Sequence, residues 1–133
     1  MVAYSFKKRF AEPILAGTKR QTIRAHGKRR HARPGDDLQL YVAQRTKHCR
    51  LVARAKCATV HEVELFFSRH GASELFRMDG TPISLTAMAS FARLDGFNDV
   101  DEMAAFWWVE HRRLAVNGYI EFQGVMVRWD PLR

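Results

Sequence analysis

The fold of this chain is best predicted from one stretch, Ile14-Leu15-Ala16-Gly17-Thr18-Lys19-Arg20-Gln21-Thr22-Ile23-Arg24. A short apolar segment ends at Gly17, and Lys19, Thr22 and Arg24 follow it. Glycine tolerates the left-handed conformation that ends many helices, so the stretch predicts a helix followed by an extended segment. Side chains alternate along an extended segment, which places Thr22 and Arg24 on the same face. Spacing alone favours the simplest interpretation, a capped helix followed by a solvated basic strand.

The rest of the chain has strand patterns towards both ends and helix patterns between them. Alternating apolar residues bounded by turn signals predict strands, and apolar stripes behind capping residues predict helices. The predicted strands are residues 2–6, 38–42, 51–60 and 119–129, and the predicted helices are residues 10–16, 62–68, 84–94 and a helix capped by Asn98. Residues 25–34 predict a loop, and the change of apolar parity at Gly124 predicts a bulge or bend. Together these patterns predict an α+β domain.

The stretch quoted above also resembles the signature of the ASCH domain, a member of the PUA-like superfamily of small RNA-associated β-barrels. That signature consists of a short helix, Gly-x-Lys-x-x-Thr-x-Arg, and a Gly-Asp turn ahead of a strand. The matching residues are Gly17, Lys19, Thr22, Arg24 and the turn Pro34-Gly35-Asp36.

Later segments resemble the rest of the family layout. They are Leu94-Asp95-Gly96-Phe97, the helix after Asn98 and the closing strand that ends at Trp129. The resemblance therefore spans nearly the whole chain. It implies a single ASCH/PUA-like domain over residues 1–133, built on a small PUA-like β-barrel with short helices inserted between and around the strands.

Length and composition are typical of a globular protein. A chain of 133 residues that is 47% hydrophobic can bury a core without disulfides or metals. No apolar run approaches the roughly 20 residues that span a bilayer, and residues 1–7 lack the apolar centre of a signal peptide. Two cysteines are too few for a disulfide framework. These observations predict a cytoplasmic, reduced protein without a membrane partner.

Charge is distributed unevenly along the chain. Residues 1–56 contain 15 lysines and arginines against three acids, whereas residues 57–133 contain 7 against 11. A basic half is typical of a surface that faces phosphates, so the pattern predicts a polyanionic partner, which the resemblance implies is RNA. The cations expected to contact it are Lys28, Arg29, Arg30 and Arg33 of the loop and Arg54 and Lys56 of a strand. A solvated loop is the alternative interpretation of residues 28–33.

The resemblance also implies a chemistry for the motif. In ASCH relatives that remove acyl groups from N4-acetylcytidine, the motif Lys and Thr act with a distant Glu. Lys19 and Thr22 match the first two, whereas the position three residues before Asn98 is Asp95. Aspartate is one methylene shorter, and a displacement of about an ångström can cost on the order of 100-fold in rate. Glu74 is the weaker alternative source of the carboxylate, and a turn residue is the alternative interpretation of Asp95.

Other residues predict how a substrate would be held. The planar guanidinium of Arg24 can bind a phosphate or a base carbonyl, or can pair with an acid to hold the shape of the site. Tyr41 and Phe97 are expected to form a cleft wall. The histidine and cysteine spacings do not match a zinc site, so no metal or other cofactor is expected.

Three functions follow from these predictions. The first is a small amidohydrolase that removes an acyl group from an N4-acylated cytidine, with Thr22 as nucleophile, Lys19 as its activator and Asp95 as the acid, base or orienting carboxylate. The second is an RNA-binding module without catalysis. The third is an ASCH-type ribonuclease. The intact Lys-x-x-Thr spacing favours catalysis on a modified pyrimidine nucleoside, and the charge asymmetry favours RNA.

Overall fold

A computed structural model describes residues 1–69 and 75–132 of the chain. The elements within these residues are β1 (Val2–Phe6), the 3-10 helix η1 (Lys8–Phe10), α1 (Ala11–Ala16), β2 (Gln21–Ala25), β3 (Asp37–Val42), β4 (Arg50–Ser68), β5 (Leu75–Met78), β6 (Thr81–Pro82), α2 (Leu85–Leu94), α3 (Val100–Glu110), the 3-10 helix η2 (Arg112–Leu114) and β7 (Tyr119–Trp129). The predicted α+β class is confirmed. Glu74, the alternative carboxylate, lies outside the described residues.

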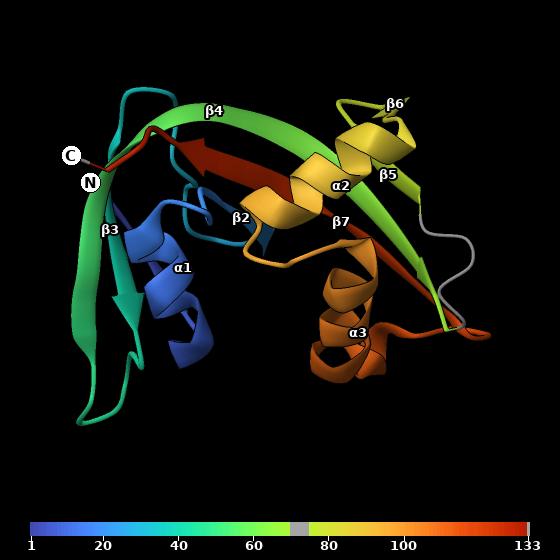
Figure 1. The fold of residues 1–133 in the computed structure, drawn as a ribbon, viewed down its shortest axis with the longest axis horizontal. Coiled ribbons are helices and arrows are strands. Elements are labelled where there is room, and N and C mark those ends of the chain that lie inside the picture. Colours follow the sequence, from blue (N-terminus) through green and yellow to red (C-terminus); the bar gives the residue numbers. More distant parts are fainter. Residues whose placement is uncertain (70–74, 133) are drawn as a thin grey trace.

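The strands form one open, seven-stranded sheet around the long, bent strand β4 (Figure 1). β4 pairs with β3, β5 and β7, while β1 is parallel to β3 and β2 is antiparallel to β7. Among the described residues β1 pairs only with β3 and β2 only with β7, so both are edge strands. A closed barrel has no edges. The sheet is therefore open, and the predicted small β-barrel is not closed.

The helices lie on the inner side of the bend in β4 (Figure 1). α1 ends at Gly17, whose φ of 83° is the left-handed conformation that the motif predicted. Ser84 caps α2, and Asp99 caps α3 by accepting a hydrogen bond from the Glu102 amide. The cap of α3 is thus one residue later than the predicted Asn98. No helix in the described part of the chain is long and apolar enough to cross a membrane.

Residues 62–68 are not the predicted helix, because β4 continues through them to Ser68. Val63, Leu65 and Phe67 are buried on alternate positions, and the segment pairs with β7 on one side and β5 on the other. Period-two burial is the pattern of a strand. The predicted strand over residues 51–60 is therefore the first half of a much longer one.

Gly124 does not form the predicted bulge or bend. β7 pairs without interruption with both β2 and β4 at this position. Residues 124–127 are buried one after another, so both faces of this half of β7 are covered. The alternation of apolar residues shifts here for that reason. A Cβ at Gly124 would collide with the Arg24 carbonyl oxygen and would lie 2.7 Å from the Phe122 ring. Glycine is therefore required for close packing of β2 against β7.

Replacing Gly124 with alanine should lower the free energy of unfolding by about 1–3 kcal/mol, because main-chain atoms of β2 would have to move. Urea denaturation measures the change. The control is Gly27→Ala, where an added Cβ meets no atom within 4 Å. Equal effects of the two substitutions would contradict this account of the β2–β7 contact.

Candidate active site

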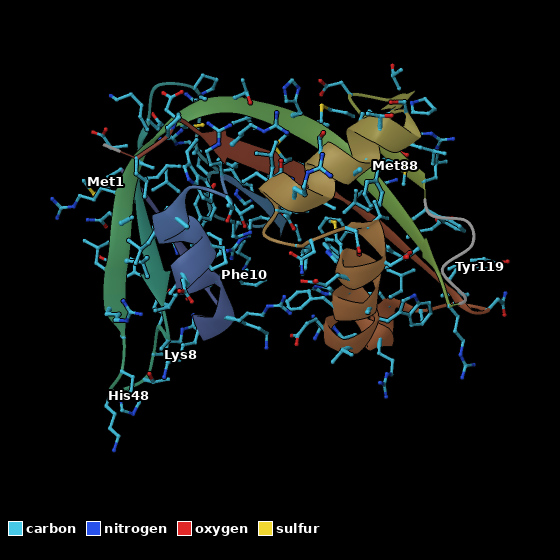
Figure 2. The ribbon with its side chains drawn as sticks, in the orientation of Figure 1. Met1, Lys8, Phe10, His48, Met88 and Tyr119 are labelled. Atoms are coloured by element: carbon cyan, nitrogen blue, oxygen red, sulfur yellow. The ribbon has the colours of Figure 1, made fainter. Side chains whose placement is uncertain are left out.

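One cleft of about 600 Å³ lies between the N-terminal segment, β2, β7 and α3. Five of the predicted site residues line it, namely Lys19, Thr22, Arg24, Asp95 and Phe97. The cleft is built from segments distant in sequence, and Phe10 lies between α1 and α3 (Figure 2). Its volume is within the range of roughly 300–1,000 Å³ that is typical of small-molecule sites.

Lys19 is buried at the floor of this cleft, with an exposed fraction of 3%. Its Nζ donates hydrogen bonds to the main-chain oxygens of Gln21 at 2.9 Å and Asp95 at 2.6 Å. The same nitrogen lies 4.6 Å from the centre of the Phe10 ring and 3.9 Å from Asp95 Oδ1. Two N–H groups satisfy both main-chain oxygens, so the third position can hold either a proton or a lone pair.

The residues around Lys19 also complete the C-terminal end of α2. The Arg20 amide donates to the Leu94 oxygen at 2.8 Å, and Gln21 Nε2 donates to the Phe91 oxygen at 3.2 Å. The last carbonyl groups of a helix have no partner within the helix. Residues 19–21 supply such partners here, so the motif joins the start of β2 to the end of α2. This contact is a structural role for Lys19 that does not depend on catalysis.

Asp95 forms a buried ion pair with Lys19. Its carboxylate is 8% exposed and accepts a hydrogen bond from Gln21 Nε2 at 3.4 Å. Burial raises the pKa of Asp95 to about 6, against the lowering effect of Lys19. Burial lowers the pKa of Lys19 to about 8, against the raising effect of Asp95. Burial thus shifts both pKa values towards neutral pH, the direction that suits acid and base catalysis.

Thr22 and Arg24 lie side by side on β2, as the alternation predicted. Arg24 Nε donates to Thr22 Oγ1 at 2.9 Å, and Arg24 Nη2 donates to the Ser5 carbonyl oxygen of β1 at 2.6 Å. Arg24 therefore links β1 and β2, two edge strands that are not paired with each other. Its guanidinium also lies 5.2 Å from the centre of the Tyr4 ring, and burial lowers its pKa. The side chain is held in place before any ligand binds.

Aromatic rings form much of the remaining wall. Phe97 packs edge-on against Phe10, and Phe106 of α3 contacts both rings. Gly96, with a φ of 100°, lets these groups approach Lys19, because a Cβ there would lie 3.0 Å from Lys19 Cδ and 3.1 Å from the Phe10 ring. The Asp95-Gly96 pair thus places the carboxylate and makes room for the lysine beside it.

Several lining residues were missed by the sequence analysis. They are Lys7, Trp107, Glu110, His111, Arg113, Glu121 and Gln123. His111, at the end of α3, lies 4.3 Å from Trp107 between ring centres, and burial lowers its pKa. Lys7 pairs with Glu110 at 3.1 Å and so joins the N-terminal segment to α3. No local motif marks these residues, because the fold brings α3 and β7 to the cleft.

Tyr41 does not line this cleft. It is half-buried on β3, and its hydroxyl donates to Gln39 at 3.4 Å. The expectation that it shares a cleft wall with Phe97 is not met, because no residue of β3 lines this cleft.

The predicted RNA-contacting cations lie away from the cleft on exposed segments. Lys28, Arg29, Arg30 and Arg33 belong to the loop after β2, and Arg54 and Lys56 are exposed on β4. Two of them already have partners, since Arg30 pairs with Asp36 at 3.1 Å and Lys56 with Asp37 at 3.5 Å. The loop is anchored where the Ala32 amide donates to Tyr4 Oη.

No protein-family model, curated protein or solved structure matches this chain.

Proposed function

We propose that this chain is an ASCH-type, PUA-like hydrolase that removes an acyl group from an N4-acylated cytidine. The observation that carries the proposal is the buried Lys19–Asp95 pair in the same cleft as Thr22. A buried ion pair is weak evidence for stability, because desolvation can cost more than the attraction returns. In a cleft, a pair whose pKa values are drawn towards neutrality is instead typical of acid–base chemistry.

The proposed reaction uses Thr22 as the nucleophile. Neutral Lys19 accepts the hydroxyl proton, and Thr22 Oγ1 attacks the acyl carbonyl carbon. The bond from that carbon to the cytidine N4 then breaks, and the nitrogen receives a proton as the free amine leaves. Water cleaves the acyl-threonine ester, releasing the carboxylic acid and restoring the hydroxyl. Asp95 orients Lys19 and favours its protonated form after the first proton transfer.

The walls of the cleft fit a nucleoside as substrate. The base would lie against the Phe97 and Phe106 rings, because flat heterocycles stack on aromatic side chains. Arg24 would donate to a base carbonyl oxygen from the same strand that carries Thr22. The same contacts suit the second candidate, an RNA-binding module. Thr22 Oγ1 and Lys19 Nζ already have hydrogen-bond partners, so both groups have a structural role that does not require catalysis.

The proposal is tested by incubating the unmutated protein with N4-acetylcytidine, with other N4-acylated cytidines and with a short single-stranded RNA, followed by chromatography. Release of cytidine and the carboxylic acid is the expected result. Cleavage of the RNA without release of an acyl group would replace the amidohydrolase with a ribonuclease. Binding of the nucleosides without turnover of any of them would leave the binding module as the function.

A further inference from the structure

A second cleft, of about 550 Å³, lies beside the end of α1 and the end of α2. Its polar side chains are Thr18, Arg20, Arg93 and Asn98, and no carboxylate lines it among residues 1–69 and 75–132. Phe97 lines both this cleft and the candidate active site. The proposed hydrolysis makes no use of this second cleft.

The fold places the two arginines together although they are distant in sequence. The Arg20 amide donates to the Leu94 oxygen at 2.8 Å, which ties its segment to the residue after Arg93. The Trp129 amide donates to the Arg20 oxygen at 2.9 Å, so the main chain of Arg20 is held on both sides. Arg93 belongs to the last turn of α2, and its Nη2 donates to Ser90 Oγ at 3.2 Å. Both side chains extend from a fixed backbone.

Among the described residues, the two arginines of this cleft are not paired with an acid. Neither Arg20 nor Arg93 forms an ion pair within the described part of the chain, unlike Arg30 and Lys56 of the predicted RNA surface. Arg128 Nη2 donates to Gln21 Oε1 at 2.9 Å, so a third guanidinium lies beside the residue that follows Arg20. Uncompensated cations in a hollow raise the local concentration of anions.

The carbonyl groups at the end of α2 and the Glu102 carboxylate, which could oppose an anion here, already have partners. The last carbonyl groups of α2 would repel one, but those of Leu94 and Asp95 accept hydrogen bonds from the Arg20 amide and Lys19 Nζ. Glu102, which accepts from Asn98 Nδ2, is already paired with Arg9 at 3.0 Å. The second amide hydrogen of Asn98 remains as a donor beside the two guanidinium groups.

We infer that this second cleft binds a phosphate group, with Arg20 and Arg93 as its charged ligands. Guanidinium groups match phosphate oxygens in geometry and form two parallel hydrogen bonds to them. The phosphate can come from a small phosphorylated molecule or from the backbone of a nucleic acid, and both supply the same oxygens. The inference concerns binding alone and stands whether or not the first cleft is catalytic.

The test is titration of the ¹⁵N-labelled protein with inorganic phosphate, and separately with a short single-stranded RNA, at low ionic strength. Amide shifts of residues 18–20 and 93–98 follow binding. Arg20→Gln and Arg93→Gln should each weaken phosphate binding about tenfold, since each removes a charge-assisted contact. Arg112→Gln removes the same charge from η2 and is the matched control, with an expected change below about twofold.

The two titrations identify the source of the phosphate. If the double variant Arg20→Gln/Arg93→Gln loses affinity for both ligands, the cleft binds the nucleic-acid backbone as well as free phosphate. If it loses affinity for inorganic phosphate alone, the ligand is a small phosphorylated molecule. The inference is overturned if the double variant binds phosphate as tightly as the unmutated protein, or if Arg112→Gln weakens binding equally. Unchanged spectra outside the cleft show that the variants are folded.

Discussion

Replacing Thr22 with valine should lower the turnover of N4-acetylcytidine by roughly 10³-fold or more, because the proposed nucleophile is removed while the shape of the side chain is nearly kept. Substrate affinity should fall much less, since Arg24 and the aromatic walls remain. Steady-state kinetics, together with binding measured on the inactive variant, separate the two effects. Thr22→Ser keeps a hydroxyl at the same position and is the matched control, which should retain measurable turnover.

The pH dependence of the same reaction gives an independent check. Only neutral Lys19 can accept the hydroxyl proton, so kcat/KM should rise as the pH approaches the Lys19 pKa of about 8. Asp95→Glu would lengthen the carboxylate that contacts this lysine. Activity should increase if the shorter side chain limits the reaction, and should decrease if the cleft is adapted to aspartate.

Equal turnover of Thr22→Val and Thr22→Ser would contradict the proposed role of Thr22 as the nucleophile.

The second large effect concerns stability. Lys19→Met leaves the Asp95 carboxylate buried without its cation, and breaking a buried pair in this way costs roughly 3–5 kcal/mol. A domain of this size is stable by about 5–15 kcal/mol, so much of its stability would be lost. The loss should be larger at pH 8 than at pH 5, because Asp95 in the variant can become neutral at the lower pH. Urea denaturation at both pH values measures it.

The two pKa values determine whether the stability of the protein rises or falls with pH. The folded pKa of Asp95, about 6, lies above its ordinary value of 3.8, so the unmutated protein loses stability as pH rises from about 4 to 6. The folded pKa of Lys19, about 8, lies below 10.5, so stability returns as pH rises from about 8 to 10.5. Without the lysine charge, the pKa of Asp95 rises further. The Lys19→Met variant therefore continues to lose stability at pH values above about 6, where the unmutated protein no longer does.

The double variant Lys19→Met/Asp95→Asn separates the effect of the buried Asp95 charge on stability from the effect of the lost Lys19 hydrogen bonds. It contains neither titrating group, so it should recover part of the stability lost in Lys19→Met, and the pH dependence due to the pair should disappear. If Lys19→Met instead costs the same at pH 5 and pH 8, the lysine acts mainly through its hydrogen bonds to the Gln21 and Asp95 carbonyl oxygens.

Local signals predicted the part of the site that lies within one segment. Gly17 ends α1 in the left-handed conformation, and Thr22 and Arg24 share a face of β2. Asp95 was placed near Lys19 through the family layout, and the two side chains do form a pair. These features depend on conformations of a few neighbouring residues, or on the resemblance that predicted the position of Asp95. The catalytic roles of these residues stay predictions.

Features that depend on packing between distant segments were not predicted. The apolar residues Val63, Leu65 and Phe67 alternate in the sequence as in a strand. The charged residues Glu62 and Glu64 beside them also suit an exposed helix face. His111 has no neighbouring motif, and its position in the cleft depends on how α3 packs against the sheet. The open edges of β1 and β2 likewise follow from strand pairing, which alternation along one strand does not determine.

The pairing of β2 has a consequence for the order in which the molecule is made. Among the described residues the sheet partner of β2 is β7 alone, the strand that comes last in chain order (Figure 1). During synthesis Thr22 and Arg24 leave the ribosome before β7, the strand with which theirs pairs among the described residues. Contacts between such distant segments form slowly. The first cleft is therefore incomplete until β7 has joined β2, and a chain that lacks β7 should not carry out the proposed reaction.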